Sequence, residues 1–391
     1  MQRIFPLQWF RVQCFQVCAL LALYVSGFAS ATAEILLPAS EMPVPHIALL
    51  LPLNSPALGA AASAVHQGIL AAASVQSPGL PVRIYSDFDE AHSVVAAYRS
   101  ALANGAVAVI GPLTRNGIRQ LADENNIPVP TLALNVIEGQ APTQLYFFGM
   151  AVEAEARQVA LLAWQHDLKQ AIVISANNPL ARRLQFAFEE QWTASGGSIL
   201  REIEYNGNAA VFADIAATPD SMVFFATDVE KARTIRPYLP NKLAAYATSQ
   251  LFVGNSEKLV NFDLQDIHFV DMPWLLQTDQ ATVMAYPHAN PPLSTDHERL
   301  YALGIDAFRL LQVLLANQLN TALPLDGVTG RIQLNNHTFQ REAVPAVFVQ
   351  GHAQTADAPV APVVQMFPDQ FRNGLPVGPA LPMAAGLPQK Q

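Results

Sequence analysis

Short polar side chains stand directly after several apolar runs of this sequence, where buried strands are expected to end. Their hydroxyl and amide groups, with a single carboxylate, can form hydrogen bonds to a neutral or zwitterionic ligand or to a peptide. In a doubly wound sheet, the loops after the strands line the ligand crevice. We therefore predict a binding cleft lined by Asn54, Ser55, Gly111, Leu113, Thr114, Asn135, Asn177, Thr227, Asp228, Ser249, Gln250 and Trp274.

Each of these residues also fits a purely structural role. Loops between strands and helices need caps and turns, and Thr114 is placed to cap the helix that follows it. Gly111 precedes Pro112 and permits a close approach of the backbone. Trp274 is either a platform for a ligand or a residue packed under a lobe. The set as a whole, rather than any single member, is the prediction.

The common catalytic motifs are missing from the chain. It contains no GxSxG elbow, HExxH helix, Walker A loop or GxGxxG fingerprint, and no two of its nine histidines are four residues apart. We expect no enzyme activity, no cofactor and no metal site. A hydrolase with two carboxylates on facing elements stays open as an alternative, because one sequence does not show which carboxylates meet.

Short apolar runs alternate with helical patterns along the chain, which is typical of βαβ units. Strands are expected at residues 46–53, 81–85, 106–110, 130–134 and 145–148, and the pattern restarts with strands at 171–174, 198–205, 221–225, 243–246 and 268–270. The fold class is therefore α/β, with two doubly wound Rossmann-like lobes joined by a hinge. The longest helix is expected at 294–319, followed by a closing hairpin of 329–334 with 346–349.

The two lobes are expected to exchange segments. We assign residues 44–148 and 276–322 to lobe 1, and residues 149–275 and 323–352 to lobe 2. Several crossings between the lobes would form a hinge that allows closure on a ligand. Residues 353–391 are rich in Pro and Ala and lack periodicity, so we expect a disordered tail.

The first 33 residues have the pattern of a cleaved signal peptide. Arg3 and Arg11 precede an apolar stretch at 17–28, and Ala31-Thr-Ala33 is a small-x-small cleavage pattern. A transmembrane anchor is the alternative, but the apolar stretch is short for it. Cys14 and Cys18 lie too early for a lipobox. We expect a periplasmic protein without a lipid anchor, and without stable membrane insertion once the signal is cleaved.

The charge balance argues against two classes of partner. The chain has 31 Asp and Glu against 22 Lys and Arg, a formal net charge of −9, and no basic run longer than Arg182-Arg183. Nucleic acid and anionic membrane surfaces are therefore not expected to bind it. Both cysteines lie within the expected signal peptide, so the mature chain relies on its apolar core rather than on disulfides.

An ordered set of short motifs resembles a known family. It comprises HIALLLPL at 46–53, GPL at 111–113, LALN at 132–135, FFG at 147–149, EAEA at 153–156, Arg183 through Phe188 to Trp192 with Gly196-Gly197, DMPW at 271–274, LGIDA at 303–307 and GVTG at 327–330. Over residues 44–352 the chain resembles the penicillin-binding-protein activators of the LppC/LpoA type. The resemblance implies a type I periplasmic-binding fold.

The resemblance also implies a function. Such activators bind a bifunctional peptidoglycan synthase, a class A penicillin-binding protein, and stimulate its cross-linking without being enzymes themselves. We therefore expect a non-enzymatic periplasmic activator or scaffold whose partner is such a synthase, with a small molecule or muropeptide as a further ligand. The alternative is the solute-binding receptor of an ABC-type importer for an amino acid or peptide-like ligand, which the polar loops at the strand ends also favour.

Overall fold

The computed structural model describes residues 43–76, 79–85, 90–124 and 126–356. The described residues from Pro45 onward belong to one compact unit of the chain. The expected signal peptide, its cleavage site, both cysteines and the tail from residue 357 lie outside the described residues. Within the described residues, no helix combines the length and apolar character needed to cross a membrane.

Residues 46–148 and 325–342 together build a sheet whose central strands are parallel. Its eight strands lie in the order β11-β12-β13-β5-β4-β3-β1-β2. β12 is antiparallel to both β11 and β13, and β13 runs parallel to β5. The strands are β1 (His46–Leu49), β2 (Val82–Ile84), β3 (Ala106–Ile110), β4 (Thr131–Ala133), β5 (Leu145–Phe148), β11 (Leu325–Asp326), β12 (Arg331–Asn335) and β13 (Thr338–Glu342).

Helices cover both faces of this first sheet. Along β1, Ile47 and Leu49 pack with α2 (Gly59–Val75) and α11 (Thr295–Leu315), while Ala48 packs with α3 (Glu90–Ala103) and α4 (Arg115–Ala122). Successive side chains of a strand point to opposite faces, so a strand buried on both faces is a continuous apolar run. This is why the parallel strands are recognisable in the sequence.

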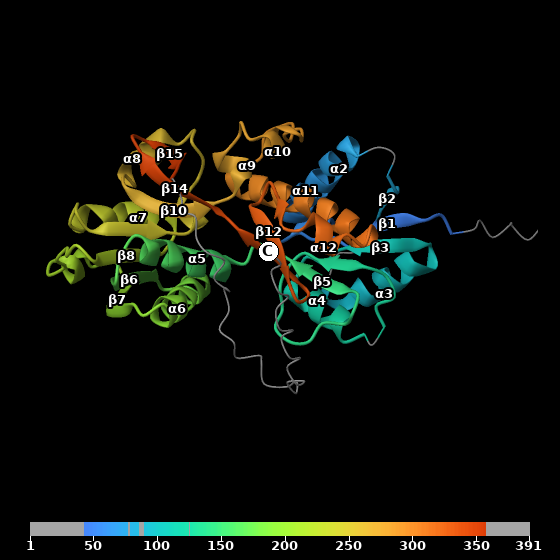
Figure 1. Ribbon diagram of the computed structural model, residues 1–391, viewed down its shortest axis with the longest axis horizontal. Coiled ribbons are helices and arrows are strands. Elements are labelled where there is room, and N and C mark those ends of the chain that lie inside the picture. Colours follow the sequence, from blue (N-terminus) through green and yellow to red (C-terminus); the bar gives the residue numbers. More distant parts are fainter. Residues whose placement is uncertain (1–42, 77–78, 86–89, 125, 357–391) are drawn as a thin grey trace, which may run out of the picture. The chain divides into compact units, whose positions relative to one another are not determined.

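The second sheet has seven strands in the order β15-β14-β10-β9-β8-β6-β7. In β6, Ala171 and Val173 pack against α5 (Val152–Gln165) and α6 (Pro179–Ala194), and Ile172 and Ile174 join the opposite cluster with α7 (Val229–Ile235). The two sheets lie on opposite sides of the ribbon view in Figure 1. The strands are β6 (Gln170–Ala176), β7 (Ser198–Tyr205), β8 (Ser221–Ala226), β9 (Ala244–Ala247), β10 (Ile267–Asp271), β14 (Val344–Val349) and β15 (His352–Thr355).

Shorter elements complete the described chain. They are three 3-10 turns, η1 (Ala209–Phe212), η2 (Arg236–Tyr238) and η3 (Ser249–Leu251), and the short helices α8 (Lys258–Asp263), α9 (Pro273–Leu276), α10 (Ala281–Met284) and α12 (Leu319–Ala322). α9 follows β10 and carries Trp274 into the core under the first sheet. It therefore belongs to a connection between the two sheets.

The expected α/β architecture with two doubly wound sheets is confirmed. The longest helix, α11, begins at Thr295, one residue after its expected start. Ser294 is its N-cap and accepts a hydrogen bond from the His297 amide. It ends at Leu315 rather than at 319, since Asn317 takes a left-handed conformation with φ of 52°.

The prediction of the closing hairpin is wrong. β12 pairs with β13, and β14 pairs with β10 and β15, so residues 329–334 and 346–349 are not partners. Residues 325–342 extend the first sheet beside β5, which contradicts the assignment of 323–352 as a whole to lobe 2. Residues 353–355, expected in the tail, belong to edge strand β15. Strand patterns show where strands occur but not which strands pair; the other lobe boundaries stay predictions.

Candidate functional site

The chain passes between the two sheets at three crossovers. The first follows β5 at residues 149–151, the second is Met272 between β10 and α9, and the third is Ala343 between β13 and β14. The side chain of Gln158 on α5 holds the third crossover, since Oε1 accepts from the Ala343 amide at 3.0 Å and Nε2 donates to its carbonyl at 2.7 Å. One side-chain amide thus satisfies both backbone groups of the linking residue.

Buried polar residues join these crossovers in a continuous network. Glu155, near the start of α5, accepts hydrogen bonds from Arg341 on β13 and from the amide and hydroxyl of Ser249. Arg341 also donates to the Thr329 carbonyl at 3.3 Å. Glu155, Ser249 and Arg341 are each at most 8 % exposed. We call the whole set the crossover network: Glu155, Ser249, Asp271, Arg299, Asp306, Thr329 and Arg341.

The network continues to the end of β10. Arg299 on α11 forms an ion pair with Asp271, with 2.7 Å between Nη2 and Oδ2, and Nη2 also donates to the carbonyls of Ser249 and Phe252. Burial acts to lower the pKa of Arg299, but the carboxylate of Asp271 outweighs it and raises that pKa, so the guanidinium stays charged. A strand end of the second sheet is thereby tied to a helix of the first.

Asp306 anchors the other end of the network. Its carboxylate is fully buried and accepts from the amides of Val328 and Thr329, from the Thr329 hydroxyl at 2.7 Å and from Arg309. The network therefore fixes the turn before β12 as well as the crossovers. Buried ionic groups are stable only when every member is paired. The paired network therefore holds the three crossovers in fixed positions relative to one another.

The residues predicted to line the cleft from the first sheet are largely engaged in local structure. Asn54 is exposed, and the hydroxyl of Ser55 accepts from the Leu58 amide at 3.3 Å. Thr114 caps α4 by accepting from the Gly117 amide, which confirms its expected capping role. Asn135 donates to the Leu113 carbonyl at 3.4 Å, so these loops meet.

Gly111 has a definite structural requirement. Its φ is 108°, and a Cβ added there would lie 2.2 Å from the Leu50 carbonyl oxygen. The peptide bond to Pro112 is cis. The group that approaches Gly111 closely is the end of the neighbouring strand, and the role of Gly111 in ligand binding stays a prediction.

The predicted residues of the second sheet divide into exposed and buried groups. Asn177 is exposed and accepts from Arg182, and Asp228 is the N-cap of α7, accepting from the Lys231 amide at 2.9 Å. Thr227 is only 3 % exposed, and its hydroxyl has no hydrogen-bond partner within the described residues. Gln250 is half-buried, whereas Ser249 lies inside the crossover network.

Trp274 is a packed residue, which decides between the two roles that its sequence position left open. It is 1 % exposed, its indole Nε1 donates to Glu298 at 2.7 Å, and its ring packs against Tyr301 and His288. It therefore belongs to the core beneath the first sheet and is not a surface platform.

Sequence reasoning missed a charged cluster beside the Asn135 loop. Arg115 at the start of α4 lies 3.6 Å from Glu153 of α5, and Arg183 of α6 contacts the same carboxylate oxygen at 2.6 Å. Arg115 also donates to Asn135 at 3.4 Å. The second oxygen of Glu153 is buried and has no hydrogen-bond partner among the described residues. An amine, amide or hydroxyl donor would satisfy it.

Titration of Glu153 gives a testable pH dependence. Burial alone acts to raise its pKa, but a backbone hydrogen bond and the guanidinium groups of Arg183 and Arg115 hold the pKa below the ordinary value. A depressed carboxylate pKa stabilises the fold above the unfolded pKa of about 4.3, and this contribution is lost as the pH falls through the lower folded-state pKa. The Tm gap between wild type and Glu153→Gln should be constant above about pH 5 and shrink below about pH 4.

The exposed Glu257 provides a control for this measurement, because no side-chain ion pair of Glu257 occurs among the described residues. Thermal unfolding of Glu257→Gln should differ little from wild type at every pH. A Tm gap for Glu153→Gln that is unchanged down to about pH 3 would show that the ionised carboxylate does not stabilise the fold.

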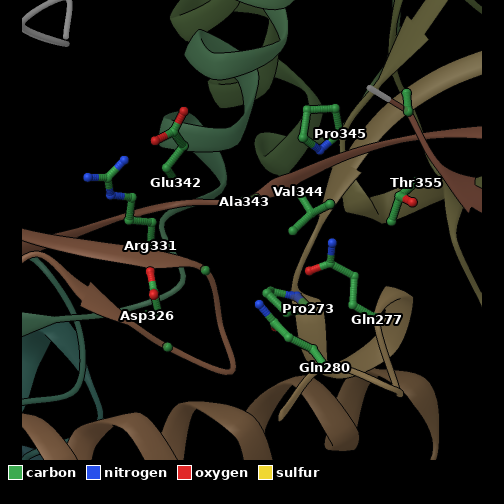
Figure 2. A pocket seen from close by; sticks show the side chains of 13 residues that line it. Pro273, Gln277, Gln280, Asp326, Arg331, Glu342, Ala343, Val344, Pro345 and Thr355 are labelled. Carbon is green, nitrogen blue, oxygen red and sulfur yellow. The ribbon is translucent and has the colours of Figure 1, made fainter. Parts of the chain in front are cut away.

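A cavity of about 390 Å³ lies on the strands of the third crossover rather than among the predicted cleft residues. It is lined by residues of α9, of the loop to α10, and of β11 to β15, and none of the twelve predicted residues lines it (Figure 2). Within the described ranges, no group of three or more His, Cys, Asp or Glu side chains has an arrangement that could hold a metal ion.

Comparison with known proteins relates this architecture to cell-envelope proteins. The family model described as "LppC putative lipoprotein" matches residues 28–218 and 213–351. A penicillin-binding protein activator LpoA of Photobacterium profundum is 25 % identical over 346 residues, covering 78 % of this chain and 56 % of that protein. The chain thus spans about half the length of the curated relatives it matches.

Two solved structures have the same fold. The LpoA C-domain of Haemophilus influenzae, described as a regulator of PBP1A, has a TM-score of 0.67 and 22 % identity, covering 80 % of this chain and 99 % of that domain. A protein of Chromobacterium violaceum, described as a "putative branched-chain amino acid ABC transporter", has a TM-score of 0.68 and 37 % identity, covering 78 % and 99 %. The fold is that of the type I periplasmic binding proteins.

The family match extends over most of the chain, and the three crossovers and every strand of both sheets except the edge strand β15 lie within the segment that it covers. The protein therefore belongs to the LppC/LpoA family.

Proposed function

We propose that the protein is a non-enzymatic regulator of peptidoglycan synthesis that binds a class A penicillin-binding protein in the periplasm. The observation that carries this proposal is the structural match to a domain described as a regulator of PBP1A. The match covers 99 % of that domain. Curated relatives that match the chain are named penicillin-binding protein activators. Membership in the same family supports an equivalent role.

The crossover network supports a role as a fixed binding surface. A protein that traps a solute by closure must change its backbone angles at the crossovers. Here the buried ion pairs Arg299–Asp271 and Arg341–Glu155 hold residues next to those crossovers. In the Arg115–Glu153–Arg183 cluster, both arginines are paired with the Glu153 carboxylate. These contacts favour a domain that presents one stable surface to a protein partner.

Binding and stimulation of a synthase test the proposal directly. The purified protein should bind a class A penicillin-binding protein of the same organism in a surface-immobilised assay. It should also increase the fraction of cross-linked peptides formed from lipid-linked precursor by that synthase. A type I solute-binding protein from the same organism is the matched negative control. Absence of both binding and stimulation would reject the proposal.

A solute-binding receptor for an amino acid or peptide-like ligand is the second candidate. The 37 % identity to the Chromobacterium violaceum protein favours it, as do Glu153 Oε2 and Thr227 Oγ1, which are buried and have no hydrogen-bond partner among the described residues. A thermal-shift screen of the twenty amino acids separates the two functions. A receptor should gain several degrees in Tm with one ligand class at saturation, because a ligand that binds only the folded state stabilises it. A regulator with no solute ligand should gain none.

Export is a separate part of the proposal. We expect the mature chain to begin at Glu34, after cleavage behind Ala33. Amino-terminal sequencing of the protein recovered from the periplasmic fraction tests this expectation. A chain that retains residues 1–33 in the membrane fraction would instead support the transmembrane anchor.

A further inference from the structure

The cavity at the third crossover has walls from both sheets. On one side stand Asp326, Arg331 and Glu342 of β11, β12 and β13, and on the other stand Gln277 and Gln280 of the α9–α10 segment (Figure 2). Ala343 of the crossover also lines the cavity. The cavity is therefore built where three separate stretches of the chain meet, and its volume of about 390 Å³ suits a small molecule.

The charged side of the cavity is a cross-strand row. Asp326 and Glu342 are the direct partners of Arg331 in the two antiparallel pairings. Residues directly opposite in an antiparallel pair project from the same face of a sheet. The register therefore places one base between two acids on a single face. Unlike the paired residues of the crossover network, these three side chains make no ion pair within the described part of the chain.

The amide side of the cavity has free hydrogen-bonding groups as well. The carboxamides of Gln277 and Gln280 are engaged in no side-chain hydrogen bond among the described residues, although their backbone amides are bonded to Pro273 and Gln277 carbonyls. A carboxamide offers both donors and an acceptor. This wall can therefore pair with the N–H and C=O groups of a peptide bond.

A turn held by buried hydrogen bonds lines part of the cavity. Gly327 and Gly330 belong to the turn that the buried Asp306 carboxylate holds through the Val328 and Thr329 amides. A Cβ at Gly330 would lie 2.2 Å from the Glu342 carbonyl, and one at Gly327 would lie 2.5 Å from Asp306 Oδ2. Ligand groups would therefore meet a preorganised wall, which lowers the entropy lost on binding.

We propose that this cavity, which we name the crossover pocket, binds a short zwitterionic peptide. The guanidinium of Arg331 receives the peptide carboxylate, Asp326 and Glu342 receive its ammonium group, and Gln277 and Gln280 pair with its amide groups. Charge-assisted hydrogen bonds to both termini give specificity for a free, unblocked peptide. The site is distinct from the strand-end loops, and it is independent of synthase regulation.

Isothermal titration calorimetry of the full-chain protein with tri-alanine as the probe tests the site. N-acetyl-tri-alanine amide, which has neither terminal charge, is the matched ligand control. Tri-alanine should bind saturably, and Arg331→Gln should weaken it by about tenfold or more, since one charge-assisted contact is lost. Arg83→Gln is the matched protein control, because Arg83 is an exposed arginine on β2 of the same sheet.

The outcomes separate this pocket from the strand-end loops and from synthase binding. The double variant Asp326→Asn with Glu342→Gln should also bind tri-alanine more weakly, whereas Asn135→Ala should bind it as wild type does. The pocket is rejected if tri-alanine shows no saturable binding up to about 10 mM, a weak limit for specific binding, or binds Arg331→Gln and wild type equally. Equal binding of the blocked peptide would reject it as well. Synthase binding is measured separately, so either proposal can fail alone.

Discussion

Arg299→Ala is expected to lower the free energy of unfolding by about 3–5 kcal/mol. The substitution leaves the carboxylate of Asp271, which is fully buried, without its cationic partner. It also removes the donor to the Ser249 and Phe252 carbonyls. An uncompensated buried charge costs several kcal/mol, far more than the attraction between exposed groups contributes. Urea unfolding at neutral pH measures the loss.

The surface pair of Arg233 and Asp263 is the matched control for Arg299. Its atoms are as close, at 2.6 Å, but the side chains are 30 % and 49 % exposed. Arg233→Ala should therefore cost less than about 1 kcal/mol. The double variant Asp271→Asn with Arg299→Met should recover part of the stability, since it removes both charges from the core. If Arg299→Ala costs no more than Arg233→Ala, burial of the network is not what stabilises the crossovers.

Gly304→Val is expected to cost on the order of 4 kcal/mol or more, or to prevent folding. α2 and α11 cross so closely that a Cβ at Gly304 would lie 2.1 Å from the Val65 carbonyl oxygen. The contact is reciprocal, because a Cβ at Gly68 would lie 1.9 Å from the Tyr301 carbonyl oxygen. Backbone atoms, unlike flexible side chains, cannot turn aside. The helices would have to separate and leave voids around the core of the first sheet.

Chemical denaturation of Gly304→Val and of Gly79→Val together tests this helix crossing. Among the described residues, a Cβ at Gly79 would meet only the Gln76 carbonyl oxygen, at 3.6 Å. The Gly79 variant should stay within about 0.5 kcal/mol of wild type. Gly304→Ala should fall between the two, since its gain in helix propensity of about 1 kcal/mol offsets only part of the clash. A Gly304→Val protein as stable as wild type would show that the helices can separate without loss.

Much of the fold is readable from local pattern. Strands such as β1 and β6 are buried on both faces, so they stand out as continuous apolar runs between helical periodicities. Ser294 and Thr114 precede helices and cap them as their residue types predict. These signals depend on neighbours along the chain. They established two doubly wound sheets, the long helix and the loops at the strand ends.

Contacts between distant residues left no such signal. Glu155 and Arg341 have the residue types of a solvated helix face and a strand edge, and only the approach of α5 to β13 buries them together. The pairing of β13 with β5 could not be predicted either, because the pattern of a strand does not specify its neighbour. Local propensity therefore defined the elements of this protein. Its crossovers, its charged cluster at Glu153 and its pocket arise from long-range packing. A charged side chain is normally exposed to water, and it is buried only where the tertiary structure provides a partner for it.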